Sequence, residues 1–207
     1  MLVDEIVRRV RERSARLASG LPVPALPVGS DFSLNGIVPV PEKYRAASVL
    51  VPIVNRASEV TILLTQRTAD MPSHAGQVAF PGGRSDPTDV SLVETALRET
   101  QEETGIDPAF VTVAGFLDAY ETGTGYAILP VVGLLSDGFA LSPHAAEVAE
   151  IFEVPLSFLL DPVNRKMQSR EFQGRVRSFY SFTYEGHYIW GATAAMLLNF
   201  GERITKP

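Results

Sequence analysis

Three glutamates lie close together in the segment 92–104, at positions Glu99, Glu102 and Glu103. In a helix each residue turns by about 100°, so these three carboxylates would share one sector of its surface. Carboxylates at this spacing repel one another unless a positive charge lies among them. Hard divalent cations such as Mg²⁺ prefer carboxylate and phosphate oxygens. Taken alone, this string would be typical of a charged surface helix. Together with the glycine loop before it, the capped helix and the terminal Gly105-Ile106, it favours a metal site built from Glu99, Glu102 and Glu103.

The helix that must hold these carboxylates has defined ends. Ser91 and Glu94 form a capping-box pair at its start. Gly105 can end it, because glycine enters the left-handed conformation without a Cβ clash. Glu103 follows Ala96 by seven residues, which places it on or beside the apolar face made by Leu92, Val93, Ala96 and Leu97. We therefore expect Glu103 to differ from a solvated surface acid.

The segment 79–106 resembles the Nudix box, in which a glycine and a glutamate precede the string R-E-hydrophobic-X-E-E-X-G-hydrophobic. The matching residues are Gly83, Arg98, Glu99, Glu102, Glu103, Gly105 and Ile106. The segment also departs from the pattern. Its loop is one residue longer than the common spacing, Asp89 is the acid nearest to the absent glutamate, and Thr100 stands where a hydrophobic residue is usual.

This resemblance implies an α/β protein with the Nudix α/β/α sandwich around a mixed β-sheet, here with an N-terminal helix and a C-terminal helix. It also implies an enzyme, a pyrophosphohydrolase that cuts a nucleoside diphosphate linked to another group. We expect Mg²⁺ or Mn²⁺ as the cofactor, held by Glu99 and Glu103 with Glu102 nearby. A bound ion lowers the pKa of its water, and Glu102 or Glu147 would take the proton. Arg98 is counted with the catalytic residues because it can orient the glutamates.

A narrower resemblance precedes the box. Residues 63–83 are similar to the signature of the coenzyme A diphosphatases (CoA pyrophosphatases), of the form LLTXR followed by a glycine and FPGG. The matching residues are Leu63, Leu64, Thr65, Arg67, Ala69, Gly76, Phe80, Pro81, Gly82 and Gly83. Pro72 stands where the signature usually has a basic residue.

The same segment contains the predicted substrate contacts. Arg67 is the best candidate for binding phosphate, because a guanidinium matches phosphate oxygens; the alternative is a salt bridge from the strand end to the glutamate helix. The loop residues Phe80, Gly82 and Gly83 would bring backbone close to the helix and shape the substrate site. His74 is expected to hold the loop by hydrogen bonds.

A third similarity to the coenzyme A diphosphatases covers residues 142–161, in which an acid precedes a strand that ends in EVPL. Glu147 occupies the position of that acid, and we expect it to be a further metal ligand or the base. Glu150 and Glu153 are the competing acids, which can also be solvent-facing strand residues.

These resemblances predict hydrolysis of coenzyme A or acyl-CoA to 4′-phosphopantetheine, or its acyl form, and adenosine 3′,5′-bisphosphate. The nearer alternative is a Nudix hydrolase of ADP-ribose, NADH or dinucleoside polyphosphates. The more distant alternative is a non-catalytic nucleotide-binding module. The presence of all three helical glutamates favours an enzyme.

Composition limits the partners. The 207 residues carry a formal net charge of −6, which argues against a basic nucleic-acid groove. There is no cysteine, so disulfides, thiol catalysis and zinc–thiolate sites are excluded. The sequence has no signal-peptide pattern and no apolar run long enough to cross a bilayer. We expect a cytoplasmic monomer or homodimer that binds a small-molecule substrate and neither nucleic acid nor membrane.

The elements expected around the site follow from hydrophobic patterning. Residues 1–45 would form an amphipathic helix and a proline-rich arm packed on a domain of residues 46–207. Two apolar strands, 46–54 and 60–67, would form a hairpin before the box, and strands 111–120 and 126–135 would follow it. A turn at 121–125 would join the latter two. Residues 169–190 suggest a hairpin at the edge, and 192–200 a C-terminal helix.

Overall fold

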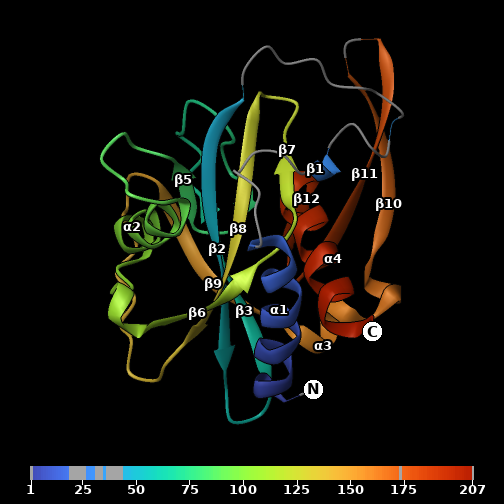
Figure 1. Cartoon of the computed structure of the whole chain (residues 1–207). Helices are drawn as coiled ribbons and strands as arrows, with labels where there is room; N and C mark the ends of the chain where they lie inside the picture. The colour runs from blue at the N-terminus through green and yellow to red at the C-terminus, as the bar shows by residue number, and fades with distance from the viewer. Residues whose placement is uncertain (1, 19–26, 31–34, 36–43, 173, 207) are drawn as a thin grey trace.

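The structure is a computed structural model that describes residues 2–18, 27–30, 35, 44–172 and 174–206. A large β-sheet lies between helix α2 (Leu92–Thr104) on one side and helices α1 (Val3–Ala18), α3 (Leu156–Leu160) and α4 (Gly191–Thr205) on the other (Figure 1). This arrangement is the predicted α/β/α sandwich. The strands of the sheet are β1 (Pro27–Ser30), β2 (Arg45–Asn55), β3 (Val60–Arg67), β4 (Val78–Ala79), β5 (Gly82–Arg84), β6 (Val111–Phe116), β7 (Ala119–Glu121), β8 (Tyr126–Leu135) and β9 (Val148–Pro155).

The sheet is mixed, as predicted. Strands β2 and β8 run parallel over ten residue pairs, from Arg45 opposite Tyr126 to Val54 opposite Leu135. Strands β2 and β3 form the predicted antiparallel hairpin. Strand β5 pairs with the start of β2, and β9 pairs antiparallel with β3. The start of β2, the short strand β5 and the glycine loop before it therefore lie side by side.

Strand β2 is buried on both faces, which explains its nearly continuous apolar sequence. Leu50 packs with Ala96 of α2, whereas Val51 and Ile53 belong to the core on the opposite face. The side chains alternate between the faces as the period of a strand requires. Odd-numbered positions of β2 thus point away from α2, and even-numbered positions point toward it.

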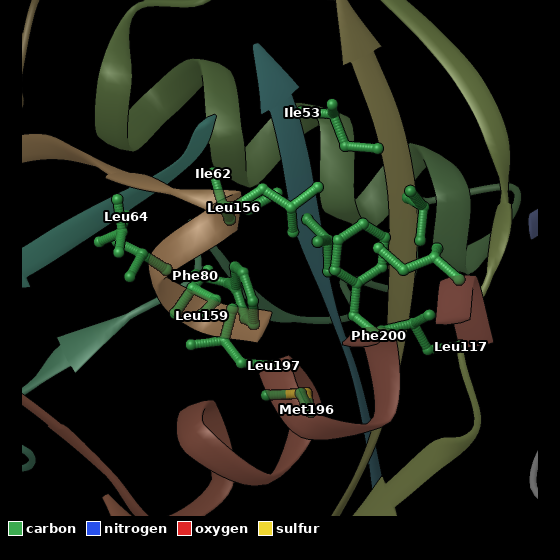
Figure 2. Close-up of a cluster of buried hydrophobic side chains, with 14 of the residues drawn as sticks. Ile53, Ile62, Leu64, Phe80, Leu117, Leu156, Leu159, Met196, Leu197 and Phe200 are labelled. Carbon is green, nitrogen blue, oxygen red and sulfur yellow. The ribbon is translucent and has the colours of Figure 1, made fainter. Parts of the chain in front are cut away.

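The main hydrophobic core lies on the face opposite α2 (Figure 2). Ile62 and Leu64 of β3 share this core with Leu156 and Leu159 of α3, and Phe200 of α4, which also belongs to it, is 1% exposed. Phe80, directly before the glycine loop, is also in this core. The loop is therefore anchored by a large buried side chain.

Helix α1 packs directly into this core. Ile6 and Val10 are at most 1% exposed and join the main hydrophobic cluster. The hydroxyl of Ser14 accepts a hydrogen bond from the backbone N–H of Phe116 in β6 (2.8 Å). Most of the proline-rich arm lies outside the described residues. Its described part includes β1, which pairs parallel with β7 and lies at the edge of the large sheet as described.

The C-terminal third differs from the expected single hairpin. Strands β10 (Lys166–Phe172), β11 (Arg175–Tyr184) and β12 (His187–Trp190) form a separate three-stranded antiparallel sheet. Helix α4 is longer than residues 192–200 and runs to Thr205. Two short 3₁₀ helices, Pro108–Phe110 and Pro162–Asn164, complete the described elements. Within the described ranges, the helices are too short or too polar to cross a membrane.

Candidate active site

Helix α2 has the predicted caps, Ser91 at its start and Gly105 at its end. Ser91 is the N-cap, and its hydroxyl accepts a hydrogen bond from the Glu94 N–H (3.2 Å). The Glu94 carboxylate accepts from the N–H of Val90 (2.5 Å), so the return half of the capping box falls one residue earlier than predicted. Gly105 has the left-handed conformation (φ 77°), and its N–H bonds to the carbonyl of Gln101 (2.8 Å).

Thr100 departs from the Nudix pattern without disturbing the helix. Its side chain is buried, with 1% exposed, where the pattern has a hydrophobic residue. Its hydroxyl donates to the carbonyl of Ala96 one turn earlier (2.6 Å). A threonine satisfied in this way can occupy a buried helix position.

The two glycines of the loop each allow a close approach. Gly82 has φ +150°, and a Cβ there would lie 2.5 Å from Cα of Val49 and closer still to the carbonyl oxygen of Ser48. A Cβ on Gly83 would meet the carboxylate of Glu99, with Cδ at 2.5 Å and Oε1 at 2.8 Å. Glycine at these positions lets the loop lie flat against β2 and against the helix.

Glu103 is a buried carboxylate, as its position beside the apolar face predicted. It is 5% exposed. Oε2 accepts a hydrogen bond from the N–H of Gly82 (3.1 Å), and Oε1 lies 3.6 Å from Nη1 of Arg67. Burial raises the pKa of Glu103 to about 7, and the hydrogen bond and Arg67 offset only part of that effect. A positive charge beside this carboxylate would therefore be strongly favoured.

Arg98 holds the other two glutamates. Its Nη1 donates to Glu99 Oε1 (2.9 Å) and to Glu102 Oε2 (3.2 Å). Its Nε and Nη2 form a fork to the two carboxylate oxygens of Asp89 (2.9 and 3.0 Å). Glu102 is also the most exposed of the three, with 59% of its side chain exposed. Arg98 thus orients glutamates, as expected.

Asp89 anchors this network. Its side chain is 3% exposed and also accepts a hydrogen bond from the Thr95 hydroxyl (2.8 Å). The guanidinium of Arg98 holds the pKa of Asp89 far below its usual range. Burial raises the pKa of the nearby Glu99, an effect only partly opposed by Arg98.

Glu147 is electrostatically coupled to the glutamates of α2. Its charge helps to raise the pKa values of Glu99 and Glu103, which places it within electrostatic range of both. Its carbonyl accepts from the N–H of Thr68, directly after Arg67 (2.9 Å). Each of the three acids in this segment also has a partner of its own: Glu147 lies 3.5 Å from Nδ1 of His144, Glu150 lies 3.1 Å from Nε2 of His187, and Glu153 binds Arg56 and Thr61.

The predicted substrate-binding residues fall into two groups. Arg67 lies beside Glu103, so the ion pair with the helix, which was the alternative to phosphate binding, is present. Its Nε is buried without a hydrogen-bond partner in the described structure. Gly82 and Gly83 line the glutamate face, which is the side of α2 that carries Glu99, Glu102 and Glu103. The Phe80 side chain is different: it is 2% exposed within the core, so it anchors the loop and presents no surface to a substrate. His74 bonds to Gln77 (2.9 Å) and holds its loop, as expected.

The donor chemistry of this face suits a hard divalent cation. Glu99, Glu102, Glu103 and the neighbouring Glu147 are all carboxylates, the ligand type that Mg²⁺ and Mn²⁺ prefer. In the described part of the chain, however, no three acidic or histidine side chains already surround a common point. Arg98 holds two of them, and Glu103 turns to Gly82 and Arg67. The predicted cluster is therefore a set of donors on one helix face and not an assembled cage.

Some site contacts have no clear sequence signal. The N–H of Ser142 bonds to the carbonyl of Thr104 (2.7 Å), and the N–H of His144 bonds to that of Glu103 (3.0 Å). These bonds fasten the segment before Glu147 to the end of α2. Backbone donors carry no residue signature, so only the three-dimensional path of the loop reveals them.

Comparison with known proteins identifies the family. A model of the NUDIX domain matches residues 44–171, more than half of the chain. The chain therefore belongs to the Nudix hydrolase family. A protein named "Uncharacterized Nudix hydrolase NudL" from Photorhabdus laumondii is 43% identical over 163 residues, which cover 79% of this chain and 87% of that protein. A protein of the same name from Pectobacterium atrosepticum is 45% identical over 171 residues, covering 79% and 84%.

Solved structures of the family are also similar. The NUDIX domain of NrtR from Shewanella oneidensis, complexed with ADP ribose, has a TM-score of 0.45 and 24% identity, covering 57% of this chain and 77% of that one. Family membership shows a hydrolase that acts on a small molecule containing a pyrophosphate bond. Nudix hydrolases generally require divalent metal ions.

Proposed function

We propose that this Nudix hydrolase is a coenzyme A diphosphatase, which cuts the diphosphate of coenzyme A or acyl-CoA. The observation that carries the proposal is the segment 63–83, LLTQR followed by FPGG, which resembles the signature of those enzymes. In the fold, two residues of this segment lie against the buried carboxylate of Glu103: Arg67 at the end of β3 and Gly82 in the glycine loop. The segment that suggests the substrate thus lies against the candidate metal ligands.

The residues at the glutamate face would have different roles in the reaction. Glu99, Glu102 and Glu103 would hold Mg²⁺ or Mn²⁺, which supplies charge neutralisation for the diphosphate and lowers the pKa of a bound water. Arg67 binds a phosphate oxygen with the guanidinium side that the ion pair leaves unused. Gly82 and Gly83 keep the backbone close enough for the substrate to reach the helix. Arg98 positions Glu99 and Glu102 through its contact with Asp89.

Two carboxylates can accept the proton of the attacking water. Glu102 has 59% of its side chain exposed, and Glu147 has 44%, so both are accessible to a metal-bound water. A general base acts on the chemical step, so its loss lowers kcat more than it raises KM. Comparing Glu102→Gln with Glu147→Gln at saturating metal therefore distinguishes them: the larger fall in kcat marks the base.

The substrate is tested by product analysis. The purified chain is incubated with coenzyme A, ADP-ribose, NADH and a diadenosine polyphosphate, each with Mg²⁺ or Mn²⁺, beside Glu103→Gln. We expect metal-dependent release of adenosine 3′,5′-bisphosphate from coenzyme A, absent in the variant. Preferential cleavage of another substrate would refute the coenzyme A assignment. Tight nucleotide binding without any turnover would favour the binding-module alternative.

A further inference from the structure

His144 joins the end of helix α2 to the turn that carries Glu147. Its backbone N–H bonds to the carbonyl of Glu103 (3.0 Å). Its own carbonyl accepts hydrogen bonds from the N–H groups of Glu147 and Val148 (both 2.9 Å), so residues 144–148 close on themselves as one tight turn. The backbone of His144 is therefore tied to the helix on one side and to Glu147 on the other.

The far side of this turn is fastened to the end of strand β3. The N–H of Thr68 bonds to the carbonyl of Glu147 (2.9 Å), and the hydroxyl of Thr68 donates to the carbonyl of Ala146 (3.1 Å). Thr68 directly follows Arg67, the ion-pair partner of Glu103. The turn thus joins the same two elements, α2 and β3, that the ion pair joins, and it holds the backbone of Glu147 relative to both.

These backbone bonds do not fix the direction of the Glu147 carboxylate. The side chain is 44% exposed, so close packing does not restrict its rotation. A glutamate in this situation spreads over several staggered rotamers unless a partner holds it. Burial raises the pKa values of Glu99 and Glu103, and the charge of Glu147 adds to this effect, so the three carboxylates repel one another. A carboxylate in such surroundings needs a donor to keep one orientation.

The imidazole of His144 supplies this donor. Its Nδ1 lies 3.5 Å from Oε1 of Glu147, and among the described residues no other side chain comes within ion-pair distance of that carboxylate. The glutamates of α2 at the glutamate face have donors of their own, which are Arg98 and Arg67. Hydrogen bonds between catalytic groups are often long before a substrate binds and shorten in the complex. For the ring to donate, its hydrogen must be on Nδ1, so the contact also selects the tautomer.

We propose that His144 is a positioning residue, which donates from Nδ1 to Glu147 and holds this carboxylate in the orientation from which it acts on the attacking water. This inference rests on the proposed function, because His144 affects the reaction only through Glu147. An orienting partner contributes to the chemical step and not to substrate binding, so its loss lowers kcat and leaves KM nearly unchanged.

The test is a double-mutant cycle between His144→Ala and Glu147→Gln, with kcat and KM for coenzyme A measured at saturating metal. We expect His144→Ala to lower kcat about tenfold and to change KM by less than about twofold. In the Glu147→Gln background the same change should have no further effect, because the carboxylate that His144 orients is no longer there. His144→Asn, whose amide can still donate, should recover most of the lost kcat.

The other imidazole–carboxylate pair on strand β9 is the matched control. Nε2 of His187 lies 3.1 Å from Oε2 of Glu150, three residues after Glu147. His187→Asn breaks a pair of the same kind on the same strand, so any effect on kcat should be the same factor with and without Glu147→Gln. An equal loss of kcat on His144→Ala in both backgrounds would overturn the inference. A Glu147→Gln protein with wild-type kcat would also overturn it, although the diphosphatase activity would stand.

NMR of the His144 ring nitrogens tests the contact without turnover. At alkaline pH, where a histidine ring is neutral, we expect a larger fraction of the Nδ1–H tautomer in wild type than in Glu147→Ala. The same tautomer ratio in both proteins would overturn the inference. If wild type cleaves no substrate, the proposed function fails, whereas the tautomer still decides whether His144 orients Glu147.

Discussion

The contact between Gly83 and Glu99 gives a sharp test of the site geometry. A Cβ on residue 83 would lie 2.5 Å from Cδ and 2.8 Å from Oε1 of Glu99, and ordinary van der Waals contact begins near 3.4 Å. Gly83→Ala must therefore move the Glu99 carboxylate by about 1 Å, and a displacement of this size in a catalytic site can lower the rate about 100-fold. We expect kcat/KM to fall by roughly that factor.

The fold should survive this change. Gly83 does not have a positive φ in the left-handed region, so alanine fits its backbone. The obstacle is the end of a flexible side chain, and alanine also reduces the entropy of the unfolded chain. We expect the free energy of unfolding to change by less than about 1 kcal/mol, which for a chain of this size corresponds to a Tm shift of about 2–4 °C or less.

Gly82→Ala is the matched control. Its φ of +150° and its approach to the backbone of Ser48 and Val49 leave no flexible atom to give way. We expect this variant to lose about 1–3 kcal/mol of stability. Hydrolysis of the diphosphate substrate and thermal unfolding are measured on both variants. A Gly83→Ala protein that keeps its rate within twofold, or that loses as much stability as Gly82→Ala, would refute the reasoning.

Three further changes test other parts of the structure. Glu103→Gln should lower metal-dependent turnover by about 100-fold or more but keep the fold, since an amide oxygen still accepts from Gly82; a near-wild-type rate in excess metal contradicts this. Asp89→Asn should lower the free energy of unfolding by about 1–3 kcal/mol at pH 7, because it removes charged hydrogen bonds to Arg98. Because the pKa of Asp89 is lowered in the folded state, the ionised carboxylate contributes to stability at pH values above its ordinary pKa of 3.8. This stabilisation disappears as the pH falls through the folded-state pKa. Urea unfolding at pH 7 and near pH 3 should therefore show that the difference in free energy of unfolding between wild type and Asp89→Asn is smaller at low pH. A difference that stays constant contradicts this prediction. Phe80→Ala should cost about 3–5 kcal/mol, because the ring is buried in the main core; a stability loss below 1 kcal/mol would mean that Phe80 does not anchor the loop.

Local patterning predicts the elements that carry the site. The apolar run of β2 predicts a strand buried on both faces, and the spacing between Ala96 and Glu103 predicts the burial of Glu103. The caps of α2 follow from Ser91 and Gly105. These features depend on residues within one or two turns of each other, so the period of a helix or strand fixes them.

Features that depend on distant residues were less predictable. Alternating residues in 169–190 indicated strands, but not that β10, beginning at Lys166, would join β11 and β12 in a sheet of their own. The burial of Phe80 depends on residues from β3, α3 and α4, so its position in the loop motif suggested a substrate contact instead. Pairing and packing between remote segments carry no local period.

The loop before α2 shows why a departure in sequence need not be a departure in geometry. The Nudix pattern has a glutamate in this loop, whereas here Asp89 is the nearest acid and the loop is one residue longer. Asp89 nevertheless reaches Arg98 with both carboxylate oxygens, and Thr95 holds it from the first turn of the helix. Because Arg98 in turn contacts Glu99 and Glu102, this short acid determines how the exposed part of the glutamate face is oriented.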